Sequence, residues 1–294
     1  MRARLIACAG VVLAAALAAP AGAAVVPVRL TAREVVVHVA PNLRMHAWPF
    51  NGQAPGPVIH VREGDVVQVT LRNAGPRKDA AGHPGAWHSV DFHAATLAPN
   101  IGFAGVAPGK QRTFSFVAAH PGVFLYHCGT APMLMHVGMG MYGAIIVDPA
   151  EPRPPATEVT LVQSEFYGAV RRGMLTPTLG ALRSGAPRVV AFNGGAMRYA
   201  SHPIHVPVGA PVRIYLIDAG PSLDSDFHVV GTIFDTVQPD GNPANALHDV
   251  STQLVPAGGA AIFELTFPQA GVYPFVTHAL RYADAGAMGR FQAG

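Results

Sequence analysis

The stretch Val61-Arg-Glu-Gly-Asp-Val-Val-Gln-Val-Thr-Leu-Arg-Asn-Ala-Gly75 decides the fold, because a similar stretch follows 145 residues later, Val206-Pro-Val-Gly-Ala-Pro-Val-Arg-Ile-Tyr-Leu-Ile-Asp-Ala-Gly220. A second pair of similar segments, from Val106 to Val123 and from Val255 to Val272, recurs at a spacing of 149 residues. Self-similarity at a nearly constant spacing indicates a repeated structural unit. The sequence therefore predicts a duplicated domain.

Each copy has the pattern of a β-sandwich. Runs such as 66–71 and 212–217 alternate in the manner of strands, and Gly, Pro and Asn turns separate them. The Pro-rich segment 148–156 cannot continue a central strand and favours an extended connector. We therefore expect an all-β protein with two tandem Greek-key β-sandwich domains, residues 24–150 and 151–294.

The composition limits the classes of function. Half of the 294 residues are apolar and 13% are charged, so the chain can bury a sizeable core. The formal charge of +3 comes without a Lys/Arg run, which argues against nucleic acid as a partner. Residues 1–23 combine Arg2 and Arg4 with an apolar run and a small-residue end, the pattern of a secretory signal peptide. Since this run is short for a membrane span, we expect export without an anchor.

Removal of the signal leaves Cys128 as the only cysteine, which excludes an intramolecular disulfide. Successive side chains of a strand point to opposite faces. If segments 87–93 and 123–128 are paired strands, one face carries His88 and Cys128. The other face carries Asp91, His93 and His127. The consecutive residues His127 and Cys128 thus diverge, and the sequence predicts two separate clusters of potential metal ligands.

The loop after Cys128 supplies further ligands to the first cluster. It contains His136 and Met141, with Met139 as a rival for the methionine position. Two imidazoles, a thiolate and a weak axial methionine form the ligand set of an electron-transfer copper centre. A free cysteine is more often a small buried hydrophobe, and a Met-rich loop often only packs, but His88 on the same face favours copper. The second face suits a copper open to water, and His278 is the best candidate for its third imidazole.

These motifs resemble those of the copper nitrite reductases, a family of two cupredoxin-like domains. The resemblance rests on His88-Ser-Val-Asp-Phe-His93, on Tyr126-His-Cys128 and on His136 with Met141, and it extends from about Val35 to Phe291. It implies two coppers per subunit. The type 1 copper would have the ligands His88, Cys128, His136 and Met141, and the type 2 copper would have the ligands His93, His127 and His278.

The resemblance also implies the chemistry. Nitrite would be reduced by one electron to nitric oxide, with Asp91 and His228 as the catalytic pair and Val230 at the position of a bulky aliphatic residue over the type 2 copper. An external cupredoxin or cytochrome c would donate the electron, which would pass through the Cys128–His127 link. The family's homotrimer would complete the type 2 site across a subunit interface, and the signal peptide would direct the protein to the periplasm for denitrification or detoxification.

Two other functions share parts of this pattern. A two-domain laccase-like multicopper oxidase has the same fold, but its trinuclear cluster needs several His-x-His pairs, and this sequence contains none. A non-enzymatic copper electron-transfer protein would use only the first cluster and the neighbouring methionines. Counting the coppers per subunit separates this last function from a nitrite reductase.

Overall fold

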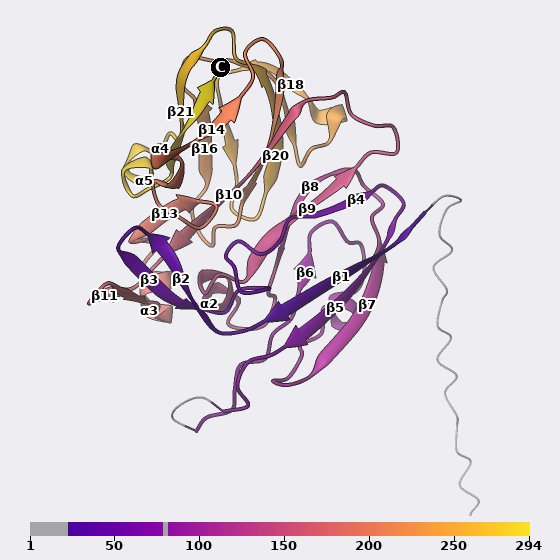
Figure 1. Cartoon of the computed structure of the whole chain (residues 1–294). Helices are drawn as coiled ribbons and strands as arrows, with labels where there is room; N and C mark the ends of the chain where they lie inside the picture. Colours follow the sequence, from indigo (N-terminus) through magenta and orange to yellow (C-terminus); the bar gives the residue numbers. More distant parts are fainter. Residues whose placement is uncertain (1–22, 79–81) are drawn as a thin grey trace, which may run out of the picture.

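The protein consists mostly of β-strands, joined by turns and a few short helices (Figure 1). The structure is a computed structural model that describes residues 23–78 and 82–294. The predicted signal peptide, residues 1–23, lies almost entirely outside the described residues. No helix in the described part of the chain is long and apolar enough to cross a membrane.

The first half of the chain forms one sandwich of two sheets. In one sheet, β1 (Val25–Ala32) runs parallel to β5 (Val66–Asn73), which pairs antiparallel with β7 (Gln111–Val117). The other sheet has the order β4-β9-β8-β6, with bounds Ile59–Arg62, Tyr142–Asp148, Gly122–His127 and Asp91–Phe92. Helices α1 (Pro99–Gly102) and α2 (Met133–Gly138) lie in the connections. The buried core between the sheets includes the thiol-bearing Cys128.

The second half forms a larger sandwich. Its six-stranded sheet has the order β13-β10-β15-β20-β17-β18, with bounds Val189–Phe192, Thr157–Phe166, Pro211–Asp218, Ala260–Thr266, Phe234–Pro239 and Leu247–Val250. Its five-stranded sheet has the order β14-β22-β21-β16-β19, with bounds His202–Val206, Met288–Ala293, Gly271–Thr277, Ser225–Val229 and Thr252–Val255. The short helices are α3 (Leu179–Arg183), α4 (Arg198–Ser201), η1 (Pro243–Asn245) and α5 (Leu280–Asp284). Strands β5 and β15 thus cover the runs that the alternating pattern predicts as strands.

A fifth sheet links the two halves. It has the order β11-β12-β3-β2, in which β2 (Val35–Ala40) and β3 (Leu43–Ala47) come from the first half. Strands β11 (Ala169–Arg171) and β12 (Met174–Thr176) come from the second half, and β12 runs parallel to β3. The hairpin beyond the Pro-rich connector therefore packs against the start of the chain, and the boundary between residues 150 and 151 stays a prediction.

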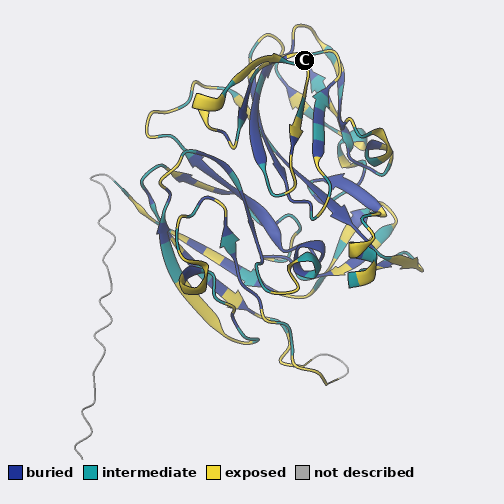
Figure 2. Cartoon of the chain, turned by 180° about the vertical axis from the view of Figure 1, so that it is seen from behind, coloured by how far each residue is buried: buried dark blue, intermediate teal, exposed yellow. Residues whose placement is uncertain are grey.

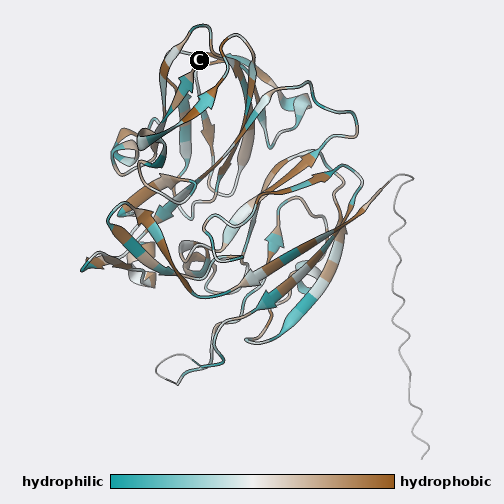
Figure 3. Cartoon of the chain, viewed as in Figure 1, coloured by the Kyte–Doolittle hydropathy of each residue, from teal (hydrophilic) through white to brown (hydrophobic). Residues whose placement is uncertain are grey.

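The outward face of β8 is covered by the chain's own second half. Val123 and Leu125 are buried in a cluster with Tyr215, Ile217 and Ile262, which belong to β15 and β20. Figures 2 and 3 show this junction as buried and hydrophobic. Burial of these two residues therefore needs no neighbouring subunit. Full burial of an aliphatic side chain contributes about 1.5–3 kcal/mol, so this contact fixes the two halves relative to each other.

The segment 87–93 is not one regular strand. Only Asp91 and Phe92 form β6, opposite His127 and Tyr126 of β8, while His88 makes an isolated bridge to Val106. The strand expected over 123–128 is β8, which ends at His127 and leaves Cys128 as the first residue after it. The two histidine-bearing segments are nevertheless neighbours, as the pairing argument requires.

Candidate metal centre

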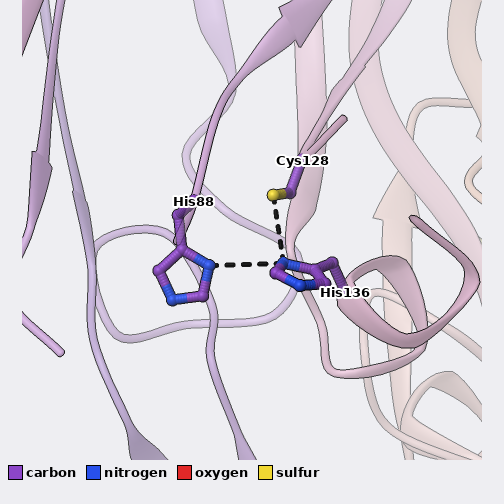
Figure 4. A group of neighbouring side chains, drawn as sticks. All are labelled: His88, Cys128 and His136. Carbon is purple, nitrogen blue, oxygen red and sulfur yellow. Dashed lines mark hydrogen bonds between the residues drawn. The ribbon is translucent and has the colours of Figure 1, made fainter. Parts of the chain in front are cut away.

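Three buried donor side chains converge at one end of the first sandwich, and we call His88, Cys128 and His136 the inner group (Figure 4). The Nδ1 atoms of His88 and His136 are 3.3 Å apart, and Cys128 Sγ lies 3.2 Å from His136 Nδ1. The residues come from the bridge to Val106, the end of β8 and helix α2. Ligands that share one small metal ion, each about 2.0–2.3 Å from it, have donor atoms spaced in this way. The inner group therefore has the composition and spacing of a metal site.

Burial keeps the two imidazoles of the inner group neutral. Desolvation lowers the pKa of His88 to about 4, with a further contribution from the charge of His136. Desolvation likewise lowers the pKa of His136 to about 4. A neutral imidazole has a free lone pair, which a metal ion needs. At neutral pH both rings are thus ready to act as ligands.

Met141 is better placed than Met139 to be the methionine of this site. Met141 is fully buried in the same hydrophobic cluster as Cys128, and its carbonyl oxygen accepts a hydrogen bond from the Cys128 backbone N–H at 3.0 Å. Met139 lies outside that cluster, and its carbonyl oxygen instead accepts from the backbone N–H of Trp48. The position of Met141 favours it as the axial ligand.

Two residues at the inner group were not predicted from the sequence. The backbone N–H of Ser89 donates to Cys128 Sγ at 3.3 Å, and the Ser89 hydroxyl oxygen lies 4.0 Å from the same sulfur. The indole of Trp48 contacts both imidazoles: its ring centroid lies 5.7 Å from that of His88 in a tilted arrangement and 5.4 Å from that of His136 in an edge-on arrangement. Strict alternation would turn Ser89 away from Cys128, and only the irregular backbone of this segment brings it back. No sequence pattern places Trp48 here.

The second cluster, which we call the outer group, consists of Asp91, His93 and His127. The Nε2 atoms of His93 and His127 are 3.1 Å apart, and the carboxylate of Asp91 lies within 4.8 Å of both ligand nitrogens. His127 is buried and His93 is exposed. The Nδ1 atom of His127 donates to the carbonyl oxygen of Cys128 at 3.1 Å, which leaves Nε2 as the acceptor nitrogen. His127 is thus held in the tautomer that a metal ion can bind.

The outer group opens into a pocket with a volume of about 240 Å³. Besides His93 and His127, the pocket is lined by helix α2 and by loops of the second half, among them Ala219, Pro221 and Gly258. Desolvation by these surroundings lowers the pKa of His93, and the nearby His127 lowers it further. The lowered pKa therefore favours a neutral His93 imidazole, beside a space that a small anion can fill.

His278 and His228 lie apart from both groups within one chain. Their rings contact each other, with centroids 5.6 Å apart, at the outer end of the β16–β21 pair. His228 Nδ1 donates to the Ser251 carbonyl oxygen at 2.6 Å, and His278 is exposed. Val230 is also exposed, at 44%. The sequence-based hypothesis assigns His278 to the same metal as His93. Among the described residues of one chain, however, His278 is not part of the cluster that contains His93.

Comparisons with known proteins agree with this architecture. Two family models, both described as multicopper oxidase, match residues 31–152 and 171–294. The copper-containing nitrite reductase of Neisseria meningitidis serogroup A is 37% identical over 274 residues, which cover 91% of this chain and 69% of that protein. The chain belongs to the copper-containing nitrite reductase family.

Solved structures extend this family assignment to the three-dimensional fold. A copper nitrite reductase from Nitrosomonas europaea matches with a TM-score of 0.83 and 37% identity, covering 92% of this chain and 94% of that one. A structure named multicopper oxidase matches with a TM-score of 0.80 and 27% identity, covering 92% and 89% of the two chains. As a member of the copper-containing nitrite reductase family, the chain is a copper-dependent oxidoreductase with two tandem cupredoxin-like β-sandwiches. The resemblance drawn from the sequence motifs is confirmed.

Proposed function

We propose that the protein reduces nitrite to nitric oxide, using one type 1 and one type 2 copper per subunit. The overall reaction takes up one electron and two protons per nitrite and releases water. The inner group, with Met141, would hold the type 1 copper. The outer imidazoles of His93 and His127, together with His278, would hold the type 2 copper. The names of the relatives support nitrite as the substrate, and the pocket beside His93 has room for it.

The donor sets fit these two roles. A thiolate and two neutral imidazoles in a buried site select copper for electron transfer, whereas imidazoles alone leave a copper open to a small ligand. When bound, the coppers would supply a one-electron store at the inner group, and Lewis-acid and redox chemistry at the outer group. The Ser89 N–H, which donates to the Cys128 sulfur, would stabilise negative charge on the thiolate.

The third imidazole of the outer group would come from a neighbouring subunit. His278 is exposed and lies beside His228 on the second half, while His93 is exposed on the first half. In a homotrimer the second half of each subunit would meet the first half of the next. The same contact would occur three times and would complete three equivalent sites. A closed cyclic assembly of this kind needs two different surfaces per chain, and these two histidine-bearing surfaces meet that need.

Asp91 and His228 would handle the protons. The carboxylate of Asp91 is close to the outer imidazoles and only partly buried, so it can hold a proton next to a bound nitrite oxygen. His228 would face the same space from the neighbouring subunit. Its Nδ1–H donates to the Ser251 carbonyl oxygen, which would leave its Nε2 as the nitrogen that exchanges a proton. Val230, exposed two residues further on, would limit how nitrite can orient.

The electron would reach the outer group through the chain itself. Cys128 and His127 are adjacent in sequence, so one peptide unit connects the two donor sets. The electron would come from a soluble cupredoxin or cytochrome c in the periplasm, to which the predicted signal peptide would direct the protein. Consecutive residues that feed two different donor clusters are the observation that carries this proposal.

The proposal is tested by mixing copper-loaded protein with nitrite and a small artificial reductant under anaerobic conditions and measuring nitric oxide with an electrode. We expect one nitric oxide for each electron consumed. The His278→Ala variant, loaded with copper in the same way, should produce none. Oxygen consumption coupled to phenol oxidation, with no nitric oxide from nitrite, would favour a laccase-like oxidase instead.

A further inference from the structure

The pocket beside the outer group is larger and more apolar than a site for nitrite alone needs to be. Its volume is about 240 Å³. A water molecule takes up about 30 Å³ of the liquid, and nitrite has only two heavy atoms more than water. Among the described residues that line the pocket, only His93 and His127 have polar side chains, and none is Asp, Glu, Lys or Arg. The proposed reaction therefore leaves most of this space without a use.

The apolar part of the pocket is built between the two halves of one chain. Leu125 of β8, Val137 of α2 and Ala219, which follows β15, are buried members of the hydrophobic cluster at the junction of the halves. Two other lining residues are exposed, Met133 at the start of α2 with 48% exposure and Ala257 from the second half. The pocket thus connects the surface with a buried apolar end.

The wall that the second half contributes is held by its own hydrogen bonds. The backbone N–H of Ala219 donates to the carbonyl oxygen of Gln163 at 2.9 Å, and the backbone N–H of Gly258 donates to the carbonyl oxygen of Asp218 at 2.8 Å. Because these N–H groups already have acceptors, this wall presents mainly apolar contacts to a ligand. The two imidazoles therefore form the polar end of an otherwise apolar site.

A pocket of this kind suits a small ligand with a polar head and an apolar tail. Small-molecule sites are mostly apolar, and a few polar groups fix the orientation of the ligand. The head has to carry a nitrogen–oxygen group that the proposed chemistry of the outer group can reduce by one electron. The tail has to be a short hydrocarbon chain. Esters of nitrous acid, R–O–N=O, combine these two parts.

We propose that the protein also reduces short-chain alkyl nitrites, with the alkyl tail in the apolar end of the pocket. The inference rests on the proposed function, because it uses the same outer group and the same external source of electrons. One electron and one proton enter the ester, and the bond between its alkoxy oxygen and its nitrogen breaks. The nitrogen leaves with its terminal oxygen as nitric oxide, and the alkoxy oxygen takes the proton to give the alcohol. Asp91 would supply this proton.

The length of the tail is the variable that tests the pocket. An alkyl nitrite is neutral, so burial of its tail has to supply much of its binding. Each methylene that leaves water for an apolar site strengthens binding about fourfold. From methyl to butyl nitrite we therefore expect kcat/KM to rise about threefold for each added carbon. An alkyl nitrite that reacted at an open surface would show no such dependence.

The assay uses copper-loaded protein and an artificial reductant under anaerobic conditions, with methyl, ethyl, propyl and butyl nitrite as substrates. A slightly alkaline buffer keeps hydrolysis of the esters to nitrite slow. Nitric oxide is measured with an electrode, and the alcohol is measured in the same samples. We expect one alcohol for each nitric oxide, and no accumulation of nitrite.

Substitutions at the opening should change the preference between the ester and nitrite. Ala257→Leu fills part of the pocket, so the ratio of kcat/KM for butyl nitrite to that for nitrite should fall about tenfold. Met133→Ala removes an apolar contact, and the same ratio should fall about threefold. Met174→Ala, at a half-buried methionine on β12, is the control and should change the ratio less than twofold. The copper content should match the wild type in all three variants.

A second readout needs no copper and no turnover. Butyl formate has the shape of butyl nitrite, with a C–H group in place of the nitrogen, and it is not reduced. In copper-free protein labelled at its methionine methyl groups, butyl formate should shift the carbon resonance of Met133 in a saturable way. The resonance of Met174 should stay in place, and methyl formate should have a much smaller effect at the same concentration.

Ester rates that do not depend on tail length, an equal loss in Met174→Ala, or a Met133 resonance that butyl formate leaves unchanged would overturn the inference. The proposed function can fail separately. If nitrite yields nitric oxide but the esters react without regard to their tails, the proposed function stands and this inference falls. If the esters yield nitric oxide with the expected dependence on tail length but nitrite yields none, the inference stands and the proposed function falls.

Discussion

The inner and outer groups differ in where their ligands come from. The inner group is complete within one chain, because His88, Cys128 and His136 are all buried at one end of a single sandwich. The outer group has two imidazoles and a carboxylate at the rim of a pocket, with His93 exposed. An electron store can be built into a domain core, whereas a substrate site has to open to solvent. In our proposal the outer group is completed only by assembly.

Replacement of the thiolate should have the largest effect, and it should act on the inner group alone. Cys128→Ala removes the only thiolate donor of the proposed type 1 site, so we expect complete loss of the intense visible absorption of the type 1 copper. Electron transfer from protein donors should stop as well. The outer copper should remain, as seen in its paramagnetic resonance spectrum. A visible band that persists in Cys128→Ala would mean that another residue binds the inner copper.

Replacement of His278 should affect the outer group and leave the inner group intact, the reverse of Cys128→Ala. His278→Ala should release the outer copper and abolish nitric oxide production, while the inner copper keeps its visible band. The exposed His248→Ala on β18 is a matched control, since it also removes a surface imidazole of the second half. Metal analysis of both variants checks this. Full outer copper in His278→Ala would show that a different residue completes the site.

Asp91→Asn separates proton delivery from metal binding at the outer group. General acid–base catalysis contributes typically 10²–10⁴-fold, so turnover should fall by roughly that factor with the copper content unchanged. If Asp91 only orients His93, the change should instead weaken copper binding by about 10–100-fold with less effect on the rate of loaded protein. Nitric oxide production and copper content, measured on the same samples, distinguish these two roles.

The inner imidazoles predict how the copper-free protein responds to acid. Their native pKa of about 4 lies below the value of about 6.5 expected in the unfolded chain. Between these values the unfolded chain binds protons that the native state does not, so stability should fall as the pH drops from 6.5 to 4. The Tm of copper-free protein should drop across this range, and less steeply in His136→Leu. An equal slope in both proteins would contradict neutral inner imidazoles.

Ser89 should have the smallest effect, and only on the inner group. Its hydroxyl lies 4.0 Å from the sulfur and accepts a hydrogen bond from Gly129 N–H at 3.0 Å. Removal of this polar group in Ser89→Ala should lower the reduction potential of the inner copper by roughly tens of millivolts, because less negative charge on the thiolate is stabilised. Redox titration of the visible band measures this shift. An unchanged potential would leave only the backbone N–H of Ser89 with a tuning role.

The same contrast explains what the sequence could and could not predict. The division of the ligands into two groups follows from the alternation of side chains, and it is robust because His127 and Cys128 are adjacent. Ser89 and Trp48 escaped prediction, since the first depends on an irregular backbone and the second on a contact between distant segments. The cover over Val123 and Leu125 escaped as well, because alternation shows that a face is apolar but not which segment packs on it.

The role of His278 illustrates a deeper limit. Its place in the chain is fixed by the end of β21, yet its proposed partner imidazoles belong to another copy of the molecule. Neither local pattern nor the fold of one chain contains that contact. The contact is predicted by the family resemblance, and the copper content of His278→Ala tests it.

The most direct test is a copper count on the fully loaded wild-type protein, combined with its electron paramagnetic resonance spectrum. The account predicts two coppers per chain, one giving the small hyperfine splitting of a thiolate-bound site and the other the larger splitting of a site bound by imidazoles. One copper per chain with the thiolate-type signal alone would contradict it, because His127 and its neighbours would then bind nothing.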